Sequence, residues 1–234
     1  MLHSFKYGDT KLIVDMLTAD YGRMSCIAAV GKQGKGKLRR QYFQPLTIIE
    51  AVADMRRRTG LLPLKEARVA TPYASIPFDP VKLPVALFTA EFLANATRRE
   101  QGDQMVFAYA ENSLRWLDGC RGGFANFHVV FMMRLTRFLG FYPNIDGYAD
   151  GCWFDLRAAG FCPDAPLHGD RLPPDEARKV SLLLRMNFAT MHLFKMTRAE
   201  RNRMTDIIIR YYELHVPDFK EMKSLEVVKE VFNP

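Results

Sequence analysis

The stretch TKLIVDMLTADYGRMSCIAAV, residues 10–30, predicts two β-strands separated by a turn. Its first part, Thr10–Thr18, and its last part, Arg23–Val30, are rich in the β-branched and apolar residues that favour strands. Tyr21-Gly22 between them is typical of a turn. The stretch therefore predicts an N-terminal region built from β-strands.

Further strand segments lie on both sides of this stretch. One is expected near Leu2, another at Phe43–Val52 after an early proline, and one or two more at Leu61–Thr71. About five short strands in about 70 residues, with a basic loop between two of them, are typical of a small closed barrel such as an OB-fold. An SH3-like barrel is the structural alternative.

A proline-rich segment ends the β-region. The sequence TPYASIPFDP at 71–80, followed by Pro84, can continue neither a helix nor an inner strand. We therefore expect a domain boundary here. An OB-fold domain is predicted at 1–76 and a second domain at 77–234.

The second domain is predicted to be mostly α-helical, so the fold class is multidomain, β then α. Helices are expected at Val85–Thr97 and Gln104–Leu117. A third helix is indicated by an apolar stripe at helical spacing, made of Phe127, Val130, Phe131, Leu135 and Phe138.

Start and stop signals place the remaining elements. Pro173-Pro174 suits a helix start, and the capping box Thr197-Arg-Ala-Glu200 opens a helix that Pro217 stops. Cys152 and Cys162 flank a small β-hairpin insertion.

Composition excludes several classes of protein. The chain has 234 residues, of which 48% are hydrophobic, so it can build real cores rather than remain disordered. No apolar run approaches the roughly 18 residues of a membrane span, and the N-terminus is polar where a signal peptide is apolar. We expect a cytoplasmic protein without a membrane partner.

The net charge of +7 is concentrated in the first third of the chain. Residues 1–80 hold 13 Lys and Arg against 7 Asp and Glu, which gives +6, whereas residues 81–234 hold 20 against 19, which gives +1. This asymmetry favours an N-terminal module that faces a polyanion, nucleic acid before a membrane surface.

A loop at 31–40, GKQGKGKLRR, carries five cations and no acid: Lys32, Lys35, Lys37, Arg39 and Arg40. Its glycines let a phosphate chain approach the backbone closely. With Tyr42 and Phe43 adjacent, the loop matches the charged groove and stacking platform that bind single strands. The alternative is a solvated loop without a partner.

The same loop nearly matches the phosphate-binding motif G-x-x-x-x-G-K-S/T of nucleotide hydrolases. Leu38 stands where a hydroxyl group should bind magnesium, and Tyr42-Phe43 favours a strand where the motif needs a helix. A nucleotide hydrolase is therefore not expected.

Metal and catalytic sites are not expected either. Cys152, Cys162 and His168 lack the paired spacing of a zinc site, and nothing in the sequence orients a base toward a thiol. The acids are scattered, without a paired-carboxylate motif. We predict no catalytic residues, no metal and no cofactor.

The N-terminal residues resemble the RecO family of recombination mediators in bacterial DNA repair. The matching run is Leu2-His3-Ser4, Tyr7-Gly8-Asp9-Thr10, Leu12–Leu17, Thr18, Gly22-Arg23, the basic loop and Gln44-Pro45. The helix Phe131–Phe141, followed by Pro143, is similar to a helix of the family's second domain.

The resemblance implies a non-enzymatic protein with an N-terminal OB-fold and a C-terminal helical domain. Such proteins bind single- and double-stranded DNA, anneal complementary strands and, with RecR, help load recombinase onto DNA coated by single-strand-binding protein. A nucleoid-associated location follows. The expected DNA-binding residues are Arg23, Lys32, Lys35, Lys37, Arg39, Arg40 and Tyr42.

The resemblance also implies a groove in the helical domain for the acidic, apolar C-terminal tail of single-strand-binding protein. Arg134 and Arg137, beside Met133, are the candidates, because arginines next to an apolar surface can hold a carboxylate and an aromatic group together. The alternative is that these arginines only cover the helix face.

Two departures from the family pattern stand out. Some members carry a four-cysteine zinc motif, of which Cys152 and Cys162 alone remain here, so the resemblance implies no metal. Family members usually begin several residues before Leu2-His3, but the sequence does not tell whether the true N-terminus lies upstream of Met1.

Two other functions remain open. An RNA-binding or translation-associated OB-fold protein is the main alternative, because OB grooves accept either nucleic acid. A protein-protein adaptor with an incidental basic loop is the other. Oligomeric state and the geometry of partner docking do not follow from the sequence.

Overall fold

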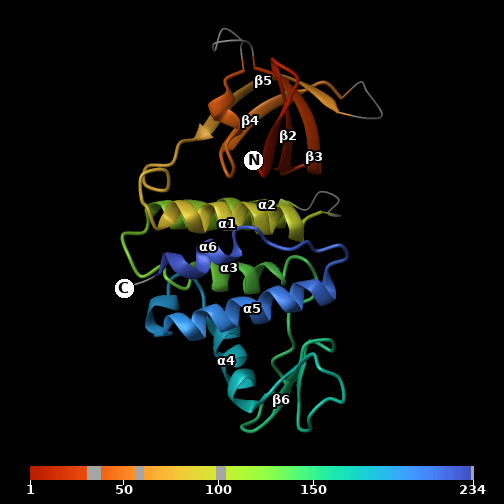
Figure 1. Cartoon of the computed structure of the whole chain (residues 1–234), viewed down its shortest axis with the longest axis vertical. Coiled ribbons are helices and arrows are strands. Elements are labelled where there is room, and N and C mark those ends of the chain that lie inside the picture. The colour runs from red at the N-terminus through yellow and green to blue at the C-terminus, as the bar shows by residue number, and fades with distance from the viewer. Residues whose placement is uncertain (31–37, 56–60, 99–103, 233–234) are drawn as a thin grey trace. The chain divides into compact units, whose positions relative to one another are not determined.

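The computed structural model describes residues 1–30, 38–55, 61–98 and 104–232 (Figure 1). They form two compact units, Met1–Gly119 and Cys120–Pro234, each described by itself below.

The described part of unit 1 contains a five-stranded sheet in the order β1-β2-β3-β5-β4, formed by β1 (His3–Tyr7), β2 (Lys11–Thr18), β3 (Gly22–Ala29), β4 (Ile48–Ala53) and β5 (Leu62–Thr71). Strands β3 and β5 are parallel, and the other neighbouring pairs are antiparallel. Backbone hydrogen bonds between Met1 and both Leu46 and Thr47, at 2.8 and 3.0 Å, draw the first strand toward the start of β4. In the described part of the chain the sheet is not closed, since β1 and β4 are its edges, so the predicted closure is wrong. The predicted OB-fold still fits, because that fold is a partly open barrel of five strands.

The barrel core follows from alternation along the strands. Leu12, Val14 and Met16 of β2 are buried, as are Cys26 and Ala28 of β3. Successive side chains of a strand point to opposite faces, so these residues fill the interior and their neighbours face outward. The turn before β3 uses Gly22 at a φ of 63°, a conformation that glycine adopts without strain.

The strands expected at Thr10–Thr18, Arg23–Val30 and Leu61–Thr71 are confirmed within a residue. The expectation that Tyr42-Phe43 favours a strand is wrong. Arg40–Phe43 form a short 3-10 helix, η2, and β4 starts only at Ile48. The reason is tertiary: Phe43 is fully buried in the barrel core beside Leu38, and one helical turn carries its ring there.

Unit 1 continues with two neighbouring helices, α1 (Lys82–Ala96) and α2 (Gln104–Gly119), which are labelled in Figure 1. The unit therefore extends past the proline-rich segment to Gly119. A domain boundary at residue 76 stays a prediction.

Asp118 of α2 anchors the proline-rich segment. Its carboxylate accepts hydrogen bonds from the backbone N–H groups of Ala74, Ser75 and Ile76, at 2.8, 2.8 and 2.9 Å. Burial raises the pKa of Asp118, but the three N–H groups outweigh burial, and the net pKa lies below the ordinary value of 3.8. Asp118 therefore stabilises the unit in its ionised form.

Unit 2 is mostly helical, with α3 (Phe127–Leu135), α4 (Pro174–Arg185), α5 (Arg198–His215), α6 (Leu225–Val231) and the 3-10 helix η3 (Met191–Leu193). A small antiparallel sheet has the order β7-β6-β8, with β6 (Trp153–Asp155), β7 (Gly160–Cys162) and β8 (Arg171–Leu172). The predicted hairpin is confirmed by the pairing of β6 with β7. The capping box at Thr197 is present, and α5 ends at His215, before Pro217.

Sequence reasoning missed α6 and β8, which are short. Among the described residues, no helix combines the length and the apolar character that crossing a membrane requires.

We predict that Asp118→Ala lowers the free energy of unfolding by about 2 kcal/mol, because three N–H groups lose a charged acceptor. The parent should also lose stability as the pH falls below about 3.8, where Asp118 takes up a proton, and the variant should lack this component. Chemical denaturation at several pH values measures both effects. Asp9→Ala, at an exposed turn position, is the control, and equal effects of the two substitutions would contradict the prediction.

Candidate nucleic-acid interface

The outward face of β1 carries a row of aromatic side chains. His3, Phe5 and Tyr7 alternate along the strand, and all three are exposed, Phe5 by 45% and Tyr7 by 54%. The rings of His3 and Phe5 are neighbours, with centroids 5.8 Å apart. Exposed rings at every second residue of a strand share one face of the sheet and form a platform there.

The register of the sheet extends this platform over β2 and β3. Phe5 lies opposite Ile13, which lies opposite Ile27, so an apolar row crosses three strands. Tyr7 lies opposite Lys11, which places a cation beside the aromatic row. We call this surface the outer face; it consists of His3, Phe5, Tyr7, Lys11, Ile13 and Ile27.

The basic loop follows β3, and only its last residues are described. Lys32, Lys35 and Lys37 lie outside the described residues. Arg39 and Arg40 are exposed, whereas Leu38 is buried in the barrel core. Tyr42 is half-buried and packs against that core. The described end of the loop is thus anchored by Leu38, with two cations at the surface.

Arg23 has partners within unit 1. Its guanidinium group donates to the backbone oxygen of Ala94 at 2.6 Å and pairs with Asp15 at 3.4 Å. These contacts give Arg23 a structural role between β3 and α1. Its contact with DNA stays a prediction.

The three candidates for partner binding in unit 2 differ in how far they are exposed to solvent. Met133 is 3% exposed and belongs to the core. Arg134 is half-buried and donates to the backbone oxygen of Met186 at 3.2 Å. Arg137 is exposed and lies over the ring of Tyr142, 4.2 Å from its centroid.

A cavity of about 500 Å³ lies between α4 and the segment that leads into α5. Its apolar lining is Leu182, Met186, Phe194, Met196 and Met204. Its charged lining is Asp175, Arg178, Lys179, Lys195 and Glu200. Sequence reasoning missed this site because its residues lie on two helices and the loop between them. Arg134 borders it through the contact with Met186.

The hairpin cysteines are free thiols. Burial, then Asp155, raises the pKa of Cys162, which disfavours the thiolate that a nucleophile or metal ligand needs. His168 interacts with Asp155 at 3.2 Å. The described residues contain no group of three or more His, Cys, Asp or Glu side chains placed to hold a metal. Absence of zinc stays a prediction.

The acids of unit 2 whose pKa is lowered make structural contacts. Hydrogen bonds from Arg157 and Arg210 lower the pKa of Asp170. The backbone N–H of Thr197, followed by Lys179, lowers the pKa of Glu200 to about 2, and this carboxylate belongs to the capping box of α5. Burial lowers the pKa of His128 to about 3, so that this residue is a neutral core histidine.

Comparison with known proteins decides the family. Residues 1–73 match the family model "Recombination protein O N terminal", and residues 77–226 match "Recombination protein O C terminal". The chain belongs to the RecO family of DNA repair proteins. The two family matches meet at the proline-rich segment, and the resemblance inferred from residues 2–45 and 131–141 is confirmed.

Curated RecO-family relatives cover the whole chain. It is 49% identical to DNA repair protein RecO of Bacteroides fragilis over 234 residues and 48% identical to that of Phocaeicola vulgatus over 233 residues. Identity to the protein of Porphyromonas gingivalis is 32% over 237 residues. In each case the match spans 100% of this chain and 97% of the relative.

Proposed function

We propose that this RecO-family chain binds single- and double-stranded DNA through the outer face and the basic loop after β3. The observation that carries the proposal is the row of exposed aromatic rings on β1, with Lys11 at one end. Exposed aromatic side chains gathered on one surface mark an interaction site. Strands 2 and 3 are the face that OB-folds use for oligonucleotides, and β1 extends it.

The two parts of the site have different tasks. Phe5 and Tyr7 offer ring faces on which successive bases stack, and such stacking contributes about 1–3 kcal/mol per base. The exposed Arg39 and Arg40, together with the loop lysines, bind phosphates. Neither contact reads base identity, so binding should be indifferent to sequence. Duplex DNA keeps its bases stacked on one another and should rely on the cations alone.

Strand annealing follows from the same chemistry. Stacking holds a base by its face and leaves the Watson–Crick edge free to pair with a complementary strand. Family membership supports a further role, with RecR, in loading recombinase onto DNA coated by single-strand-binding protein. Binding to DNA places the protein with the nucleoid in the cytoplasm.

We place the tail of single-strand-binding protein at the cavity of unit 2. Three cations, Arg178, Lys179 and Lys195, border an apolar lining there, which suits a peptide that is acidic, apolar and ends in a carboxylate. Lys179 already pairs with Glu200 at 3.1 Å, so Arg178 and Lys195 are the main candidates. Arg134 would act as a positioning residue, because it holds Met186 in the cavity wall.

The proposed role needs neither catalysis nor a cofactor. The shifted pKa values of Asp118, Asp170 and Glu200 are explained by the structural hydrogen bonds that these carboxylates accept. Burial raises the pKa of the Cys26 and Cys162 thiols, which disfavours the thiolate that a nucleophile needs.

We predict that Phe5→Ala combined with Tyr7→Ala weakens binding of single-stranded DNA by about 30-fold or more, since two stacking contacts of at least about 1 kcal/mol each are lost. Duplex affinity should change little. Fluorescence anisotropy with labelled oligonucleotides measures both. Phe78→Ala, an exposed ring in the proline-rich segment, is the control. Equal losses for single strands and duplexes would count against base stacking.

The cations are tested by salt dependence. If three to five of them neutralise phosphates, the logarithm of single-strand affinity should fall against log salt with a slope of roughly −2 to −3.5, from about −0.7 per contact. Replacing Lys32, Lys35 and Lys37 with alanine should flatten the slope by about 2, and replacing Arg39 and Arg40 should flatten it by about 1.4. Lys220→Ala, an exposed position in unit 2, is the control. An unchanged slope would show that the loop is not part of the DNA site. In a separate competition assay, tighter binding of structured RNA than of DNA would favour the RNA-binding alternative.

For the tail, Arg178→Glu with Lys195→Glu should weaken binding of a labelled acidic peptide with an apolar, free carboxyl end by about tenfold or more, because repulsion replaces attraction. The affinity of this variant for bare DNA should be unchanged. The same peptide with an amidated end is the ligand control. The matched variant Arg134→Glu with Arg137→Glu tests the positions predicted from sequence. If only this second pair weakens peptide binding, the site belongs on α3 and not in the cavity.

A further inference from the structure

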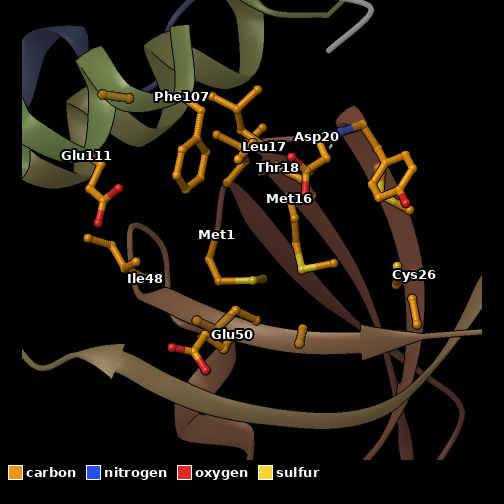
Figure 2. Close-up of a pocket in the computed structure, with 18 of the residues that line it drawn as sticks. Met1, Met16, Leu17, Thr18, Asp20, Cys26, Ile48, Glu50, Phe107 and Glu111 are labelled. Carbon is orange, nitrogen blue, oxygen red and sulfur yellow. Dashed lines mark hydrogen bonds between the residues drawn. The ribbon is translucent and has the colours of Figure 1, made fainter. Parts of the chain in front are cut away.

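A second cavity, of about 600 Å³, lies in unit 1 between the barrel and helices α1 and α2 (Figure 2). Figure 2 shows Met1, Met16 and Phe107 around one space, with the carboxylates of Glu50 and Glu111 at one side. A cavity of this volume is in the range of specific binding sites.

The lining is apolar and adaptable. Four methionines, Met1, Met16, Met24 and Met55, contribute to it. Methionine side chains are flexible and polarisable, so they adjust to ligands of different shape. Tyr21, Val52 and Met55 also line the cavity although they are 61%, 53% and 50% exposed. Apolar side chains that reach from a cavity onto the surface are typical of a site that a partner covers.

The charges around the cavity have one sign. Among its described lining residues, Asp20, Glu50 and Glu111 are charged and no lysine or arginine is present, in a chain with a net charge of +7. This sign disfavours nucleic acid as the occupant, because carboxylates repel phosphates. It favours a ligand that brings a cation.

Two of these carboxylates already hold guanidinium groups. Glu50 pairs with Arg68 on the neighbouring strand, and Glu111 pairs with Arg115 at 2.6 Å one helical turn away. The pair of Glu50 with Arg68 is exposed, and Glu111 is half-buried beside the exposed Arg115. Ion pairs at the surface contribute little, so an incoming cation exchanges with them at small cost. Asp20 interacts with the side-chain amide of Gln104 at 3.4 Å.

The backbone beside the cavity indicates the conformation of the ligand. Strand β4 is at the edge of the sheet, and all of its residues, Ile48–Ala53, line the cavity. An edge strand presents backbone groups to which an extended segment can pair, while its alternate side chains enter neighbouring pockets.

We propose that this cavity is a docking site for an extended segment of a partner protein, with apolar side chains that enter the cavity and an adjacent lysine or arginine that meets Asp20, Glu50 or Glu111. The site goes beyond DNA binding and does not depend on it. The apolar lining provides affinity, the three carboxylates select the charge, and the edge of β4 sets the backbone direction.

The test uses the full chain and a labelled nonapeptide of alternating leucine and serine with a lysine at each end. A second peptide has glutamate at each end, and a third repeats the lysine peptide with alternate backbone nitrogens methylated. The lysine peptide should bind about tenfold more tightly than the glutamate peptide, because opposite and like charges are compared at the same positions. Backbone methylation should abolish binding, because it removes the donors that pair with β4.

Variants locate the site. Asp20→Asn, Glu50→Gln and Glu111→Gln together should reduce the preference for lysine to about twofold or less by removing the charges. Val52→Lys should weaken binding of the lysine peptide without lowering the melting temperature, because Val52 is exposed. Glu66→Gln with Asp9→Asn, two exposed acids outside the cavity, is the matched control.

Single-strand DNA affinity should be the same in all of these variants, which separates this site from the outer face. Failure of all three peptides to bind, equal binding of the methylated peptide, or tighter binding of the glutamate peptide would overturn the proposal.

Discussion

The inward packing of alternate residues on β2 and β3 is the constraint on which the rest of unit 1 depends. Because Leu12, Val14 and Met16 must fill the barrel, Lys11 and Ile13 must face outward. The register with β1 then carries Phe5 and Tyr7 to the outside as well. A slip of one residue would bury Lys11 and expose the core. The hydrophobic core therefore decides where the candidate DNA site lies.

The same core anchors the basic loop. Leu38 and Phe43 are buried in the barrel, and Arg39 and Arg40 between them stay at the surface. The two arginines that we assign to phosphate binding are thus held at the surface by the buried residues on either side of them. The half-buried Tyr42 packs against the same core. Electrostatics divides unit 1 further: the loop carries only cations, whereas the cavity beside β4 is lined by three carboxylates. The two surfaces suit ligands of opposite charge.

Local signals were enough to predict much of the fold. Runs of β-branched and apolar residues, together with turn residues, predicted β2, β3 and β5, and the capping box predicted the start of α5. Burial overrode local preference at Tyr42-Phe43, which form a helical turn because the core takes up Phe43. Met133 was predicted to border a groove for a partner, but it is 3% exposed because α3 is buried on nearly all sides. When a helix is packed on several faces, its sequence has no single apolar stripe, so exposed and buried positions cannot be told apart from the sequence.

The candidate sites were harder to predict than the fold because they combine distant residues. The pattern His3-x-Phe5-x-Tyr7 is visible in the sequence, but only the pairing with β2 shows that these rings face solvent beside Lys11. Asp20, Glu50 and Glu111 meet around one cavity only after β4 and α2 are placed.

The central claim is that bases stack on the outer face, and photocrosslinking of single-stranded DNA that contains 5-iodouracil tests it most directly. The account predicts crosslinks to Phe5 or Tyr7 in the peptide spanning residues 1–11; crosslinks confined to other peptides, with none on β1, would contradict it.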